Sequence, residues 1–141
     1  MPSEFTITRR VEFSETDMAG IVHYANFFRY MEAAEHAFFR SLGTSIVDKV
    51  LHVGWPRVHA ECDYRKPLRF EDEVTVRLLV TAKNARSLRY QFRFLRGDEE
   101  VARGALTVVC VSRDEHGEMK ATNIPAAIAD RIEVAAPDQL A

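Results

Sequence analysis

Hydrophobic residues alternate with polar ones in five segments of this 141-residue chain. An apolar side chain at every second position is typical of a β-strand with one buried face. The pattern covers residues 4–13, 58–64, 74–82, 88–94 and 101–112. The sequence therefore predicts one long strand near the start of the chain and four more in its second half.

A different period marks residues 24–42. Apolar side chains recur there every three or four residues, as on one face of an α-helix, and Gly43 follows where a helix commonly stops. Ala33, Ala37 and Phe39 add apolar surface beyond that face. We therefore predict a long helix that needs a broad covering layer.

Short connections join the last four strands, at residues 68–73, 83–87 and 96–100. They force antiparallel neighbours, because a parallel return needs about a dozen residues or more. One α+β arrangement fits this order: the hotdog fold, a curved antiparallel sheet wrapped around one long central helix. A flat two-layer α+β sheet is the alternative.

The rest of the chain completes a single domain over residues 1–141. A short strand is expected beyond Gly117 and a weak helix at 125–134, while residues 135–141 are expected to form a frayed tail. A five-stranded sheet also leaves an edge strand with unpaired backbone groups. Pairing two such edges across a twofold axis would make a homodimer.

Composition and charge exclude several classes of partner. The 19 basic and 21 acidic residues give a net charge of −2, so no overall charge attracts nucleic acid or an anionic membrane. No stretch approaches the ~18 apolar residues of a membrane span. Cys62 and Cys110 lie far apart without metal-binding spacing. We expect no metal and a reducing, cytoplasmic location.

The candidate chemistry lies in residues 14–29, S-E-T-D-M-A-G-I-V-H-Y-A-N-F-F-R. Asp17 stands in a polar loop, and Gly20 allows close backbone approach just before the helix. Free N–H groups at a helix N-terminus can hold an oxyanion, and a carboxylate beside them can act as general base or nucleophile. Asp17 as a simple cap or turn residue is the alternative. Further polar groups at the helix mouth are His23, Tyr24 and Asn26.

The longer segment F-S-E-T-D-M-A-G-I-V-H-Y-A-N-F-F-R-Y-M-E-A-A resembles the active-site segment of the 4-hydroxybenzoyl-CoA thioesterase family, in its Asp-dependent branch. The resemblance extends over most of the chain. It implies hydrolysis of an acyl-CoA thioester, with Asp17 as the family carboxylate and the backbone N–H of Tyr24 as oxyanion donor. It also implies a homodimer or homotetramer. Related short-chain thioesterases often have His where this chain has Tyr24, so the role of His23 stays open.

Coenzyme A carries phosphates, so cations are expected near the outer end of the pocket. The family binds the nucleotide with Arg, Lys and Ser at subunit edges, which favours Arg86, Ser87 and Arg89. No organic cofactor is implied, because coenzyme A is part of the substrate. Gly20 and Asn26 are further candidate substrate contacts. A second basic cluster consists of Arg65, Lys66 and Arg69.

Two competing interpretations concern the helix and the reaction. A second branch of the fold uses a helix glutamate, so Glu35 competes with Asp17, whereas Glu32 is expected to be a solvated surface charge. The chain could also be a non-catalytic hotdog module that binds acyl-CoA or another small hydrophobic ligand. A carboxylate at a helix mouth argues against pure binding. A hotdog dehydratase is disfavoured by the thioesterase-like segment.

Overall fold

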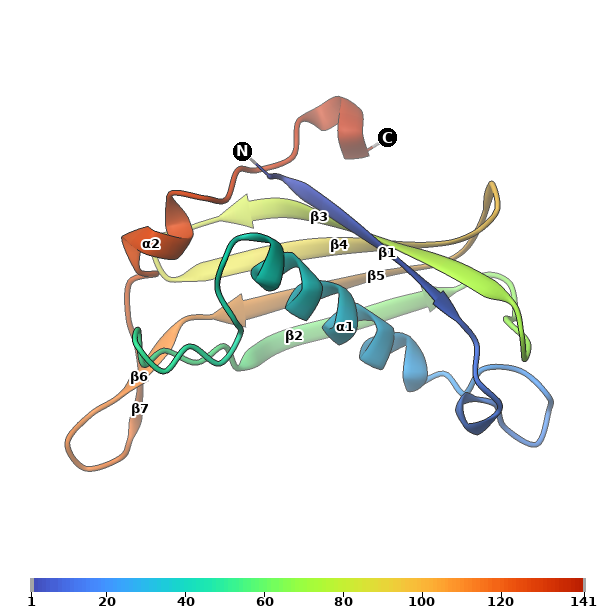
Figure 1. Cartoon of the computed structure of the whole chain (residues 1–141), viewed down its shortest axis with the longest axis horizontal. Helices are drawn as coiled ribbons and strands as arrows, with labels where there is room; N and C mark the ends of the chain where they lie inside the picture. The colour runs from blue at the N-terminus through green and yellow to red at the C-terminus, as the bar shows by residue number, and fades with distance from the viewer. Residues whose placement is uncertain (1, 141) are drawn as a thin grey trace.

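The computed structural model describes residues 2–140 and has one large sheet with a single long helix across it (Figure 1). The sheet has five strands in the order β1-β3-β4-β5-β2, and every neighbouring pair is antiparallel. The helix α1 spans Asn26–Ser41. The predicted α+β hotdog arrangement is therefore present. The strands are β1 Glu4–Arg10, β2 Arg57–Tyr64, β3 Glu73–Lys83, β4 Ser87–Arg96 and β5 Glu99–Val109.

The core lies between α1 and the sheet face that curves around it. Side chains on alternate positions of a strand point to one face, and those on β3 and β4 are completely buried on the α1 side. The helix contributes a broad apolar surface rather than a narrow stripe, as its sequence predicted. The fully buried residues include Val74, Val76, Leu78 and Val80 of β3, Leu88, Tyr90, Phe92 and Phe94 of β4, and Met31, Ala34, Phe38 and Phe39 of α1.

The two ends of the first predicted loop differ from expectation. β1 stops at Arg10 instead of residue 13. Val11 still donates its N–H to the Asp72 carbonyl at 2.8 Å, just before β3, and the chain then leaves the sheet. A 3-10 helix follows at Phe13–Glu15, capped by Glu12. The predicted helix start is two residues early, since α1 begins at Asn26.

The second half also departs from the prediction. The strand expected at 101–112 is interrupted at Cys110, whose N–H donates to the Arg86 carbonyl at 2.7 Å. The chain then enters a separate hairpin of β6 Val111–Arg113 and β7 Met119–Ala121. The helix expected at 125–134 is one turn long, α2 Ala126–Ala129.

The prediction of a frayed tail is wrong. Ala135 is buried and donates its N–H to the Val80 carbonyl at 2.7 Å, and Pro137–Leu140 forms a 3-10 helix. Residues 135–140 therefore lie beside β3 and close to the start of β1 (Figure 1). Within residues 2–140, no helix is long and apolar enough to cross a membrane.

β2 is an edge strand, and it is the most exposed strand of the large sheet. Its alternation predicted a buried face, yet Val58 and Tyr64 are 62% and 46% exposed. β5 covers one edge of β2, and no described strand pairs with its other edge. Apolar side chains and free backbone groups thus meet on one side of the molecule.

We predict that the inner face of β3 carries much of the stability. Val76→Ala removes two methyl groups from a fully buried site and should lower the free energy of unfolding by about 2 kcal/mol. Val50→Ala, the same change at a residue 85% exposed, should change it by less than about 0.5 kcal/mol. Urea unfolding followed by circular dichroism measures both. Equal effects would contradict the assigned core.

Candidate active site

Asp17 lies at the tip of a small hairpin. A bridge between Thr16 and Val22 closes the hairpin, and Asp17 donates its N–H to the Ile21 carbonyl at 2.9 Å. Gly20 completes the turn with a φ of +80°, which a residue with a side chain rarely adopts. The Asp17 Oδ1 atom accepts the N–H of Ala19 at 2.9 Å. The turn therefore fixes the backbone of Asp17 and one oxygen of its carboxylate.

The segment just before α1 leaves one backbone donor unused. Asn26 and Phe27 donate their N–H groups to the carbonyls of His23 and Tyr24, and Ala25 donates to Nδ1 of His23 at 3.1 Å. Among residues 2–140, the N–H of Tyr24 meets no acceptor. Because such a group at the start of a helix also lies at the positive end of the helix dipole, it can stabilise an oxyanion.

Asp17 and Tyr24 line the same cavity, which has a volume of about 400 Å³. Its surface is mainly apolar, with a single carboxylate and two basic residues at the wall. The structure thereby brings together two of the three candidate catalytic residues, Asp17 and Tyr24, whereas the third, His23, is not among the residues that line the cavity. The remaining lining residues are Ile21, Val22, Phe27, Tyr64, Arg65, Lys66, Pro67 and Leu68.

His23 and Asn26 flank this cavity rather than line it. The His23 ring stacks on Tyr24 with 4.4 Å between the ring centres, and its Nδ1 atom caps the turn before α1. The Asn26 side chain donates to the Glu15 carbonyl at 2.8 Å. Both residues hold the helix start in shape.

Tyr64 is a residue of the cavity wall that sequence reasoning treated only as part of a strand. Its hydroxyl donates to the Tyr24 carbonyl at 2.9 Å, and its ring meets Phe27 edge-on at 5.1 Å. Burial raises the pKa of Tyr64 to about 12, so it stays a neutral donor at pH 7. Its place at a strand end beside the basic cluster was the available signal.

The residues expected to hold coenzyme A phosphates lie elsewhere in this chain. Tyr64 is opposite Ala102, which is opposite Phe94, and Ser87 is seven residues from Phe94 along β4. At about 3.3 Å per residue, this separation is roughly 23 Å. Arg86 and Arg89 occupy the same distant end. Arg86 bonds to Asn123, and Arg89 bonds to Glu61 and Thr107.

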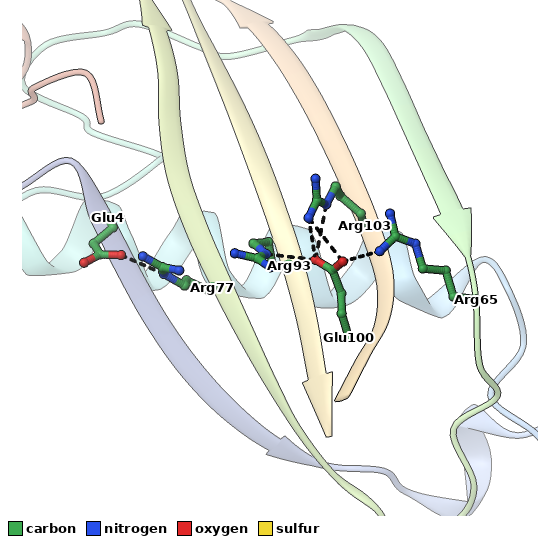
Figure 2. Close-up of polar contacts among 6 residues, drawn as sticks. All are labelled: Glu4, Arg65, Arg77, Arg93, Glu100 and Arg103. Carbon is green, nitrogen blue, oxygen red and sulfur yellow. Dashed lines mark hydrogen bonds and ion pairs between the residues drawn. The ribbon is translucent and has the colours of Figure 1, made fainter. Parts of the chain in front are cut away.

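The cations that line the cavity are Arg65 and Lys66, and Arg65 pairs with Glu100 (Figure 2). Glu100 also pairs with Arg93 at 2.8 Å and Arg103 at 3.0 Å. Burial opposes ionisation of Glu100, but hydrogen bonds from Arg93 and Arg103 outweigh it and hold its pKa below the usual value. One carboxylate thus faces three guanidinium groups, of which that of Arg65 belongs to a residue of the cavity wall. A separate pair on the same sheet joins Glu4 and Arg77.

Glu35, the competing carboxylate, is not part of this cavity. It is completely buried on α1 and forms an ion pair with Arg57. Burial raises its pKa, although Arg57 partly offsets the shift. Its surroundings also include Tyr90 and Glu32. Glu35 therefore has no access to a substrate held at Asp17 and Tyr24.

Comparison with known proteins shows the class of protein to which the chain belongs. A family model described as the thioesterase-like superfamily matches residues 11–132. A candidate esterase from Aquifex aeolicus (strain VF5) is 37% identical over 101 residues, which cover 70% of this chain and 78% of that protein. A 1,4-dihydroxy-2-naphthoyl-CoA hydrolase from Synechococcus sp. (strain CC9311) is 30% identical over 126 residues, covering 81% and 83%. The structure of a gentisyl-coenzyme A thioesterase matches with a TM-score of 0.79 and 28% identity, covering 88% and 98%.

The fold and the matched region define an enzyme of the thioester hydrolase class. The chain belongs to the thioesterase-like superfamily. The resemblance carried by the Asp17 segment is thereby confirmed at the level of the superfamily.

The buried position of Glu35 predicts a pH dependence of stability. Since its pKa is raised on folding, its contribution favours the fold at low pH and is lost as the pH rises above the usual carboxyl value of 4.5. Glu35→Gln should abolish this component. Urea unfolding between pH 4.5 and 8 should therefore show a smaller loss of stability with pH in the variant. An unchanged pH profile would contradict the assignment.

Proposed function

We propose that this protein hydrolyses an acyl-CoA thioester to a free acid and coenzyme A. The observation that carries the proposal is that one cavity is lined by both Asp17 and Tyr24, whose N–H meets no acceptor among residues 2–140. The first group can start an attack on a carbonyl carbon. The second can receive the negative charge that the attack creates.

In the proposed reaction, the thioester oxygen accepts the N–H of Tyr24. Asp17 either takes a proton from water as the water oxygen attacks the carbonyl carbon, or attacks that carbon itself and forms a mixed anhydride that water then opens. In the first route, the C–S bond then breaks and the sulfur takes up the proton that Asp17 removed from water. In the second route, the C–S bond breaks as the anhydride forms, the thiolate takes a proton from water, and hydrolysis of the anhydride returns the Asp17 carboxylate. This chemistry requires neither a metal ion nor an organic cofactor.

We infer an aromatic acyl group as the preferred substrate class. The acyl side of the cavity carries Tyr24, Phe27 and Tyr64, whose rings can contact a flat ring face-on or edge-on. Relatives named for 1,4-dihydroxy-2-naphthoyl-CoA and gentisyl-coenzyme A support this choice. A panel of aromatic, short-chain and long-chain acyl-CoA esters, assayed for thiol release, tests it. Binding without release across the panel would instead favour a non-catalytic module.

We also propose that the active unit is a homodimer formed through β2. Antiparallel pairing of two β2 strands about their midpoint sets Tyr64 opposite the partner subunit's Arg57. Within a chain, Arg57 is opposite Val108, which is opposite Leu88. The partner's Arg86 and Ser87 then come within three strand spacings of Tyr64, roughly 14 Å instead of 23 Å. A coenzyme A chain can span such a distance, and further stacking of dimers would give a tetramer.

The role of Asp17 predicts a loss of turnover in a variant of the same shape. Asp17→Asn should lower kcat by about 100-fold or more, since the amide is neither a base nor a nucleophile. Glu35→Gln is the matched control: it removes the other candidate carboxylate and should leave kcat within about threefold of wild type. Wild-type turnover in Asp17→Asn, on the best substrate of the panel, would refute the assignment.

The dimer predicts a mass of at least about 32 kDa in sedimentation, twice the 16.1 kDa of the chain. Activity should fall on dilution as dimers dissociate. Val58→Arg adds charge to the exposed β2 edge and should shift the protein towards monomer, whereas Thr8→Arg on the opposite edge strand should not. A fully active monomer would contradict both the interface and the shared site.

A further inference from the structure

Glu15, two residues before Asp17 and the last residue of the 3-10 helix, accepts four hydrogen bonds. Its carbonyl accepts the N–H of His23 at 2.9 Å and the side-chain N–H of Asn26 at 2.8 Å. Its carboxylate Oε1 accepts the N–H of Glu12 at 2.8 Å and the hydroxyl of Tyr30 at 2.9 Å. One residue thus joins the Asp17 hairpin to the start and the second turn of α1.

Tyr30 is the rigid part of this connection. It is only 1% exposed on α1, so its ring position is set by the core, and burial together with Glu15 raises its pKa well above the usual value. The hydroxyl is therefore a permanent donor. The Arg9 guanidinium lies over the Tyr30 ring, 5.5 Å from its centre. It is also 3.8 Å from the Glu15 carboxylate, so its positive charge favours the position of that carboxylate.

The contacts of Glu15 matter for the proposed catalysis because they affect the distance between Asp17 and the Tyr24 N–H. Asp17 belongs to the hairpin and the Tyr24 N–H belongs to the helix start, and the two are joined by the turn around Gly20. Glu15 ties the same two parts together, and it is not among the residues that line the cavity. Without it, the carboxylate and the oxyanion donor could shift relative to each other.

We propose that Glu15 is a positioning residue, held by Tyr30 and Asn26, that sets Asp17 against the Tyr24 N–H. Its catalytic consequence depends on the proposed function. A displacement of about 1 Å at a reacting group can cost on the order of 100-fold in rate. Loss of one of several contacts should allow a smaller shift, and we expect about a tenfold fall in kcat with KM within about twofold of wild type.

The test compares two buried tyrosines. Tyr30→Phe removes the hydroxyl that holds Glu15, whereas Tyr90→Phe removes a buried hydroxyl that faces Glu35. Both are assayed at a temperature where circular dichroism shows full folding. Tyr30→Phe should lower kcat about tenfold, and Tyr90→Phe should not. Equal kcat in the two variants would overturn the proposal.

Two further variants test whether Glu15 acts through its hydrogen-bond acceptor or through its negative charge. Glu15→Ala removes the acceptor and should lower kcat at least as much as Tyr30→Phe. Glu15→Gln keeps an acceptor oxygen for Tyr30 and Glu12 and should restore kcat to within about threefold of wild type. Failure of Gln to restore activity would show that charge, not position, is what Glu15 supplies.

A readout without activity distinguishes this proposal from the proposed function. Hydrogen exchange of the Asp17 and His23 amides, followed by NMR, should be about tenfold faster in Tyr30→Phe than in wild type and unchanged in Tyr90→Phe. If wild type hydrolyses no ester of the panel, the proposed function fails, while faster exchange in Tyr30→Phe still supports the positioning role of Glu15. Unchanged exchange in Tyr30→Phe would exclude that positioning role whatever the activity.

Discussion

The burial of α1 against the sheet is the constraint on which the rest of the structure depends. The helix is apolar over most of its surface, and a curved sheet buries far more of that surface than a flat one could. This packing fixes the helix along its whole length. The helix therefore begins at a defined place beside the end of β2. The position of the proposed oxyanion donor, the Tyr24 N–H, thus follows from core packing, and the hairpin places the proposed catalytic carboxylate of Asp17 near it.

Polar contacts hold the Asp17 hairpin against the helix, because this hairpin buries little apolar surface. Each hydrogen bond contributes roughly 1 kcal/mol net, so a hairpin held by one or two would open easily. Here Val22 donates to the Leu68 carbonyl at 2.8 Å, and Glu15 adds contacts from α1. Several modest bonds to rigid elements give the precision that a loop otherwise lacks.

Sequence patterns predicted the elements whose burial follows a local period. The alternation in β3 and β4 was sufficient, because one face of each strand meets the helix. It failed at Cys110, where the strand ends although the Cys110 N–H still bonds to the Arg86 carbonyl, and at Ala135, which bonds to β3. These contacts join residues far apart in the sequence and leave no local pattern. Tyr64 escaped notice as a site residue for the same reason.

Three carboxylates show why one of them is suited to chemistry. Glu35 is sealed in the core with Arg57, and Glu100 is shared among three arginines. Both are stable because their charge is either suppressed or neutralised, which also removes their reactivity. Asp17 differs: it is partly exposed, and within residues 2–140 its carboxylate is held through Oδ1 by the N–H of Ala19 in its own turn. A carboxylate can activate water or attack a carbonyl only when an oxygen is left over, and in this fold the hairpin supplies that condition beside the helix start.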